Sequence, residues 1–75
     1  MYEQLKTILI EDMQIEEAKI SPEAELVNDL GFNSLELAEL VVQCEEVFNV
    51  DVDEEIAKDF VTVSDVAKYL EELTA

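Results

Sequence analysis

The stretch NSLELAELVVQCEEVF, residues 33–48, decides the fold. It opens with Asn33, a residue type that caps helices, and Glu36 follows three residues later, as in a capping box. Behind this start, leucines and valines recur at spacings of three and four between carboxylates. The stretch therefore predicts an amphipathic helix that begins at Asn33 or Ser34 and runs to Phe48.

This helix carries two apolar faces, because each residue turns the chain by about 100°. One broad face, the inner face, is expected to lie on the core and consists of Leu37, Leu40, Val41, Cys44, Val47 and Phe48. A second set, the outer stripe, falls on nearly the opposite side and consists of Leu35, Ala38 and Val42. A domain of this size cannot bury both faces of one helix.

Two interpretations of the outer stripe stay open at this stage. It either packs under the preceding loop or is ordinary surface hydrophobicity, or it is a docking surface. Carboxylates that rim an apolar centre suit a partner with a shallow apolar patch surrounded by Arg and Lys. The predicted partner-binding residues are Asn33, Leu35, Glu36, Ala38, Glu39, Val42, Glu45 and Glu46, and Glu36 and Glu39 are the first acids to substitute.

Working outward, the apolar spacing predicts a first helix over residues 2–14. The loop from Ile15 to Asn33 contains Ser21-Pro22-Glu23 and Gly31, and its anchors to the core are expected to be Ile15, Ile20, Leu26 and Leu30. Residues 50–52 are a connector, residues 53–58 a brief helical turn, and Thr62 with Asp65 a capping box that opens the last helix. We predict one all-α domain over residues 1–75, a small four-helix bundle with three longer helices and a short third helix.

The charge of the chain restricts the kinds of partner that it can bind. Twenty acidic residues against four basic ones and no histidine give a net charge of −16 over 75 residues. This charge disfavours nucleic acid and membranes as partners and favours basic protein surfaces, and its self-repulsion predicts a fold that is more stable in salt. The start of the chain lacks the features of a signal peptide, and the lone Cys44 cannot form an internal disulfide, so we expect the cytoplasm or, as an alternative, an organelle matrix. We also expect a monomer.

The segment LVNDLGFNSL, residues 26–35, resembles the Asp-Leu-Gly-x-Asp-Ser-Leu signature of acyl carrier proteins, and the likeness covers nearly the whole chain. The resemblance implies that a phosphopantetheinyl transferase moves phosphopantetheine from coenzyme A onto Ser34. Acyl groups would then be carried as thioesters on this phosphopantetheine arm during fatty acid, related lipid or polyketide biosynthesis. A helix N-terminus at Ser34 suits the phosphodiester, because its free N–H groups favour negative charge.

One departure from the signature is Asn33, where the family usually has Asp. Asn keeps a side-chain acceptor for capping but removes a charge, so we expect slower loading if a transferase arginine pairs with the usual Asp. A second departure is Asp53, where a proline is often found and only a local change is expected. The position of Gly31 predicts a positive φ that turns Ser34 outward.

Other classes fit less well. Ser34 has no histidine to serve as its base, so the chain is not expected to be an enzyme. The acids from Asp51 onward fail as an EF-hand, because Ile56 occupies the glycine position and Thr62 the position of the bidentate Glu. The remaining alternative is an unmodified acidic interaction module in which Ser34 is only a helix cap.

Overall fold

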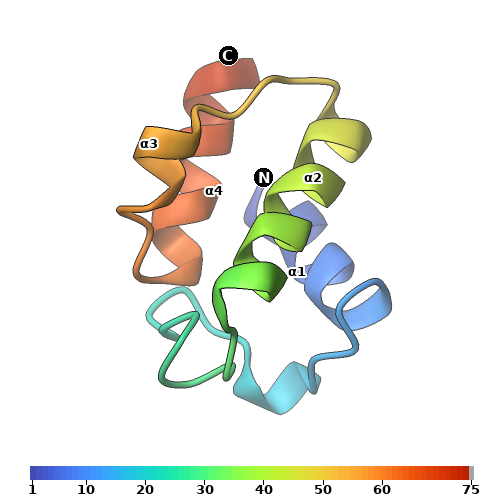
Figure 1. Ribbon diagram of the computed structural model, residues 1–75. Helices are drawn as coiled ribbons and strands as arrows, with labels where there is room; N and C mark the ends of the chain where they lie inside the picture. Colours follow the sequence, from blue (N-terminus) through green and yellow to red (C-terminus); the bar gives the residue numbers. More distant parts are fainter. Residues whose placement is uncertain (75) are drawn as a thin grey trace.

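The computed structural model describes residues 1–74, and their regular secondary structure is helical. The elements in chain order are α1 (Tyr2–Glu11), a 3₁₀ turn (Glu17–Lys19), α2 (Ser34–Phe48), α3 (Glu54–Ala57) and α4 (Val63–Thr74). Figure 1 shows α1 behind α2, α4 across from them, and the loop below the helices. The predicted fold of three longer helices with a short third helix is confirmed.

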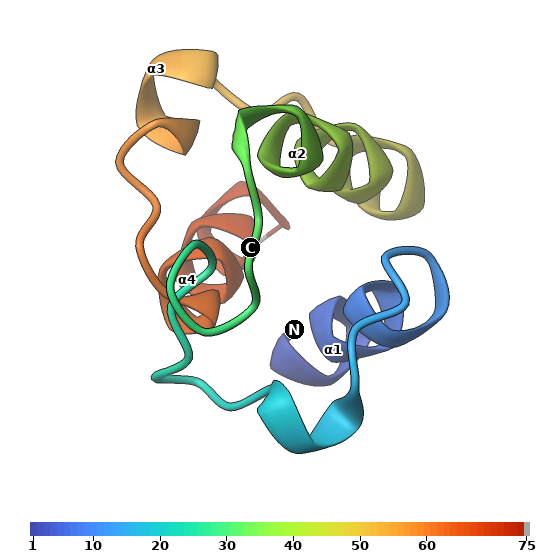
Figure 2. The same ribbon diagram turned by 60° about the horizontal axis from the view of Figure 1, so that its bottom comes forward.

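The core lies between α1, α2 and α4, which stand around a common centre (Figure 2). The helices contribute Leu5, Ile8 and Leu9 from α1, Leu40 and Cys44 from α2, and Val63, Val66, Ala67 and Leu70 from α4. The loop adds Ile20, Ala24, Leu26, Leu30 and Phe32. Three of the four predicted loop anchors are thus buried, and Ile15 is half-buried against the same core.

The first helix is shorter than predicted, because α1 ends at Glu11 and not at residue 14. The amides of Met13 and Ile15 fold back onto carbonyls of the last helical turn, those of Ile8 and Leu9, at 3.2 and 2.9 Å. Gln14 between them adopts a left-handed φ of 57°. Met13 therefore keeps its apolar contact with the core from a turn, which is why its spacing imitated a longer helix.

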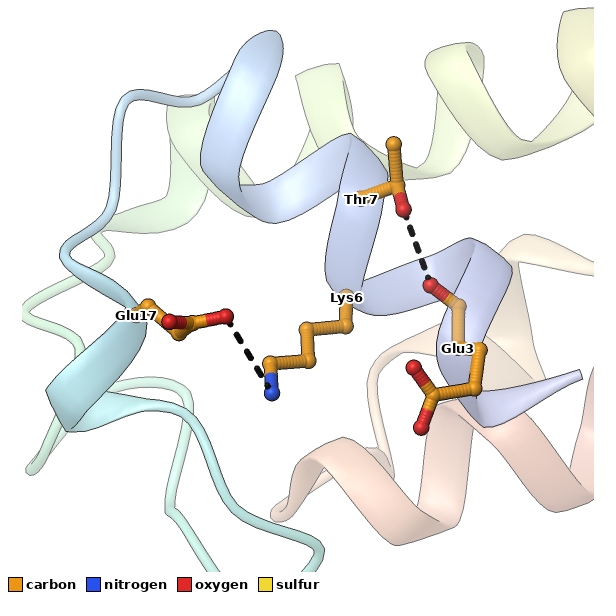
Figure 3. A network of polar contacts seen from close by, with 4 residues as sticks. All are labelled: Glu3, Lys6, Thr7 and Glu17. Carbon is orange, nitrogen blue, oxygen red and sulfur yellow. Dashed lines mark hydrogen bonds and ion pairs between the residues drawn. The ribbon is translucent and has the colours of Figure 1, made fainter.

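The 3₁₀ turn that follows α1 was not predicted. An ion pair links it to α1, with the Lys6 Nζ lying 3.6 Å from the Glu17 Oε2 (Figure 3). The Glu17 side chain is 72% exposed, so this pair adds little to stability.

On α1 itself, the Thr7 hydroxyl donates to the backbone carbonyl of Glu3 at 3.1 Å, as Figure 3 also shows.

A backbone ladder ties residues 22–26 of the loop to residues 61–64, where α4 begins. Its hydrogen bonds are Leu26 N to Val61 O at 2.8 Å, Val63 N to Ala24 O at 3.0 Å and Ser64 N to Pro22 O at 2.9 Å, around an antiparallel bridge between Glu25 and Thr62. The ladder satisfies backbone groups that a long loop would otherwise leave without partners. It fixes the chain shortly before Ser34 to the base of α4.

Candidate functional site

The N-terminus of α2 is closed by a reciprocal pair of hydrogen bonds. The Asn33 Oδ1 accepts from the Glu36 N–H at 2.9 Å, and the Glu36 Oε1 accepts from the Asn33 N–H at 3.2 Å. The predicted capping box is therefore present, and its cap is Asn33. The interpretation of Ser34 as the helix cap is wrong, because Ser34 is the first helical residue and is exposed to solvent.

The turn before the cap presents Ser34 outward. Gly31 adopts a φ of +76°, as predicted. Phe32 then turns inward, buried to 2% exposure, and its amide donates to the Leu26 carbonyl at 3.0 Å. With Phe32 held in the core, the next two residues, Asn33 and Ser34, lie on the surface. The turn thus fixes where the Ser34 hydroxyl is displayed.

The first turn of α2 retains free donors. The Glu36 N–H is used by the cap and the Leu37 N–H by the Asn33 carbonyl, whereas the amides of Ser34 and Leu35 meet no acceptor within residues 1–74. Free N–H groups at the positive end of a helix stabilise a nearby anion. A phosphodiester on the Ser34 oxygen would meet this favourable field in a chain whose net charge is −16.

A cavity of about 560 Å³ opens beside Ser34, between α2, α3 and α4. This volume falls in the ordinary range of small-molecule sites. Its apolar walls include Leu37 and Val41 of α2, Val52 and Ala57 near α3, and Phe60, Val66 and Leu70 on the α4 side. Because Ser34 itself lines the cavity, a group that hangs from its oxygen can reach an apolar interior.

The polar groups of the cavity hold the chain between α2 and α3. The Glu45 Oε2 accepts from the Val52 N–H at 2.9 Å, and the Tyr69 hydroxyl oxygen accepts from the Asp53 N–H at 3.2 Å. Asp53 also caps α3, since its Oδ1 accepts from the Glu55 N–H at 2.9 Å. The sequence predicted Glu45 only as a residue of a docking surface. Its hydrogen bond with the Val52 N–H was not predicted.

The outer stripe of α2 is open to solvent. Leu35 is 81% exposed and Val42 48% exposed, and Ala38 between them is exposed as well. The interpretation that this stripe packs under the preceding loop is therefore wrong. Ala38 and Val42 also line the cavity, so the stripe forms part of its rim. Of the predicted acids, Glu39 and Glu46 are exposed, whereas Glu36 and Glu45 are half-buried and engaged in the hydrogen bonds above.

Comparison with known proteins finds similar chains that are described as acyl carrier proteins. A solved structure described as an acyl carrier protein from Mycobacterium tuberculosis aligns with a TM-score of 0.86 and 27% identity over 95% of both chains. The acyl carrier protein of Helicobacter pylori strain J99 is 39% identical over 72 residues, 96% of this chain and 92% of that protein, and that of strain 26695 is 36% identical. A family model described as a phosphopantetheine attachment site matches residues 3–70.

The chain belongs to the acyl carrier protein family.

As a member of this family, the protein is a carrier and not an enzyme. Its cofactor is a covalently attached phosphopantetheine. The arm supplies the thiol that forms thioesters, while the protein supplies attachment and display. Residues 1–74 contain no helix long and apolar enough to cross a bilayer, and no cluster of three metal-ligating side chains.

The inner face of α2 is narrower than predicted in this carrier protein. Leu40 and Cys44 are buried, and Leu37, Val41 and Phe48 are half-buried. Val47 is 55% exposed, so its assignment to the core is wrong. It lies at the edge of the apolar arc in the last turn of α2, where the face turns toward solvent.

Cys44 behaves as the small core residue that the sequence predicted. Burial, and secondarily the charge of neighbouring Glu45, raises the pKa of its thiol from an ordinary 9.0 to about 12. The thiol is therefore neutral and poorly nucleophilic at physiological pH. The thioester chemistry of this carrier protein falls to the arm and not to the protein's own cysteine.

Proposed function

We propose that Ser34 is the attachment site, and that a phosphopantetheinyl transferase joins phosphopantetheine from coenzyme A to its oxygen as a phosphodiester. The observation that carries this proposal is that Asn33, and not Ser34, caps α2. Asn33 closes the helix, which leaves the Ser34 hydroxyl exposed beside two free amides. The single domain is then a display scaffold for one flexible arm.

The cargo best suited to this chain is an alkyl-bearing acyl group, as in fatty acid or related lipid biosynthesis. The cavity beside Ser34 has mostly apolar walls, so a hydrocarbon chain on the arm gains free energy by leaving water for it. A peptidyl or strongly polar cargo would gain little there. Relatives in Helicobacter pylori carry the name acyl carrier protein, which agrees with such a cargo.

Partner enzymes are proposed to dock on the outer stripe and its acids. Leu35 supplies the most exposed apolar contact of the stripe, and Glu39 and Glu46 are carboxylates open to solvent. With a net charge of −16, the carrier attracts basic surfaces over a long range at low salt. These properties fit a monomer that visits several cytoplasmic enzymes in turn.

Intact-mass analysis after incubation with coenzyme A and a transferase tests the attachment site. The wild-type chain is expected to gain the mass of one phosphopantetheine, and Ser34→Ala to gain none. Ser64→Ala is the matched control, because Ser64 lies in the first turn of another helix, α4, and should leave the mass gain unchanged. A wild-type chain that stays unmodified, or a mass gain that persists in Ser34→Ala, would refute the proposal and favour an unmodified interaction module.

A further inference from the structure

The hydroxyl group of Tyr69, on α4, is a polar feature of the cavity that the carriage of a plain alkyl chain does not use. Its oxygen accepts the Asp53 N–H at 3.2 Å, but within residues 1–74 the hydroxyl donates no hydrogen bond of its own. A tyrosine hydroxyl can donate a hydrogen bond as well as accept one. Tyr69 therefore brings an unused donor to the wall of the cavity.

Two contacts fix the position of this donor. The ring of Tyr69 packs against the ring of Phe60, with the centroids 5.5 Å apart and an angle of 57° between the ring planes. At the tip of the side chain, the Asp53 N–H occupies one acceptor position of the hydroxyl oxygen, so the hydroxyl hydrogen must point elsewhere. A donor restrained in this way loses little conformational freedom when an acceptor reaches it.

The charged groups of the cavity wall are poorly suited to a neutral acceptor. Glu45 and Glu54 can only accept hydrogen bonds when they are ionised. Lys58 is a donor, but its Nζ lies 3.6 Å from the Glu55 Oε1 and its side chain is 72% exposed. A neutral oxygen inside the cavity therefore depends on the neutral donors of the wall.

Tyr69 is the strongest neutral donor on the wall once the arm is attached. The Ser34 oxygen loses its hydrogen when it forms the phosphodiester. The Cys44 thiol also lines the cavity, but a thiol is a weak donor. Among the described residues that line the cavity, Tyr69 then holds the remaining hydroxyl hydrogen.

The position of Tyr69 matches the end of the arm and the first carbons of its cargo. Eleven residues separate Ser34 from Glu45 along α2, which is about 16 Å at the rise of an α-helix. Glu45 and Tyr69 hold the consecutive amides of Val52 and Asp53, so both side chains reach the same level of the cavity. An extended phosphopantetheine arm has a comparable length, and it brings the thioester and the next carbons to this level.

We propose that Tyr69 is a specificity residue of the cavity, and that its hydroxyl donates a hydrogen bond to a keto oxygen on carbon 3 of the carried acyl chain. A keto group that leaves water for apolar walls loses its hydrogen bonds, and Tyr69 replaces one of them. The cavity can thus hold a 3-oxoacyl chain as firmly as a saturated chain of equal length. This inference rests on the proposed carriage of acyl groups on Ser34.

Infrared spectroscopy of the loaded carrier tests the donor. A transferase and the matching coenzyme A thioester would load the full-length chain with 3-oxooctanoyl groups whose keto carbon is isotopically labelled, which separates the keto band from the protein bands. A hydrogen bond weakens the C=O bond, so the keto band of wild type should lie at lower wavenumber than that of Tyr69→Phe. Equal bands in wild type and Tyr69→Phe would overturn the proposal.

Asp53→Pro is the matched control, because Tyr69→Phe also removes the acceptor of the Asp53 N–H. Proline has no N–H, and the φ of −72° at Asp53 is one that proline adopts. This variant therefore loses the same bond to α4 but keeps the hydroxyl, and its keto band should stay at the wavenumber of wild type. A band in Asp53→Pro equal to that of Tyr69→Phe would assign the effect to the lost bond and overturn the proposal.

Melting temperatures separate this inference from the proposed function. An octanoyl group should raise the melting temperature of wild type and of Tyr69→Phe alike, each relative to its unacylated form, because a saturated chain has no use for the donor. A 3-oxooctanoyl group should raise it less in Tyr69→Phe than in wild type. A wild-type chain that cannot be loaded overturns both proposals, whereas a loaded chain in which the two acyl groups act alike in wild type and in Tyr69→Phe overturns the role of Tyr69 alone.

Discussion

Substitution of Asn33 tests the physical account of the start of α2. Asn33→Ala removes the bond from the Glu36 N–H to the Asn33 Oδ1, which is 2.9 Å long and lies in an exposed cap. Loss of such a cap typically costs ~1 kcal/mol. In a domain of this length, that loss corresponds to a melting temperature lower by roughly 4–8 °C.

Asn33→Asp separates the cap from the charge. The carboxylate still accepts the Glu36 N–H and gains roughly 0.3–1 kcal/mol from the helix dipole. Repulsion from the Glu36 carboxylate, which bonds the Asn33 amide at 3.2 Å, opposes that gain. We expect the stability of Asn33→Asp to lie within about 0.5 kcal/mol of wild type. If a transferase arginine reads this position, Asn33→Asp should also load faster.

The assay is thermal unfolding followed by circular dichroism at one fixed salt concentration. Gln4→Ala is the matched control, because Gln4 is an exposed amide of α1 outside any cap and its loss should change the melting temperature little. If Asn33→Ala melts with wild type, the capping box does not stabilise α2. If Asn33→Asp melts as low as Asn33→Ala, the loss cannot be assigned to the hydrogen bond.

Four further outcomes follow from the same structure. Gly31→Ala should lower the free energy of unfolding by about 1 kcal/mol in urea titration, and Gly31→Asn should cost less. The cost comes from the φ of +76° alone, since an added Cβ would meet no atom within 4 Å in the described chain outside residues 30–32. Because the pKa of Cys44 is raised from 9.0 to about 12, its contribution to stability is intact below pH 9 and declines between pH 9 and 12, and Cys44→Ala should remove that decline. Native Cys44 should also resist alkylation at pH 8 until the chain unfolds. Added sodium chloride should raise the melting temperature by screening the charge of −16, and a melting temperature indifferent to salt would contradict this reasoning.

Local features were predictable from the sequence because their causes are local. Asn33 with Glu36 fixed the start of α2, and the second box formed as expected: the Asp65 N–H donates to the Thr62 Oγ1 at 3.2 Å, and the Asp65 Oδ2 accepts from the Thr62 N–H at 3.1 Å. Gly31 likewise took the positive φ that its place before a helix implied. Each of these features joins residues within a few positions of one another.

Features that depend on distant parts of the chain were missed. The end of α1 was placed too late because Met13 reaches the core from a turn, which periodicity cannot distinguish from a helix. Val47 looked like an inner-face residue because burial depends on which neighbours cover a helix end. Glu45 looked like a surface acid because its bond to Val52 appears only when the connector folds back along α2.

The backbone ladder between residues 22–26 and 61–64 has a consequence for how such a chain can diverge. Its hydrogen bonds join main-chain atoms, so they survive the exchange of most side chains, although a proline at a donating position would break one. A deletion within the loop, by contrast, would shift the register and drag Ser34 from its place. The ladder thus tolerates changes of composition in this region more readily than changes of length.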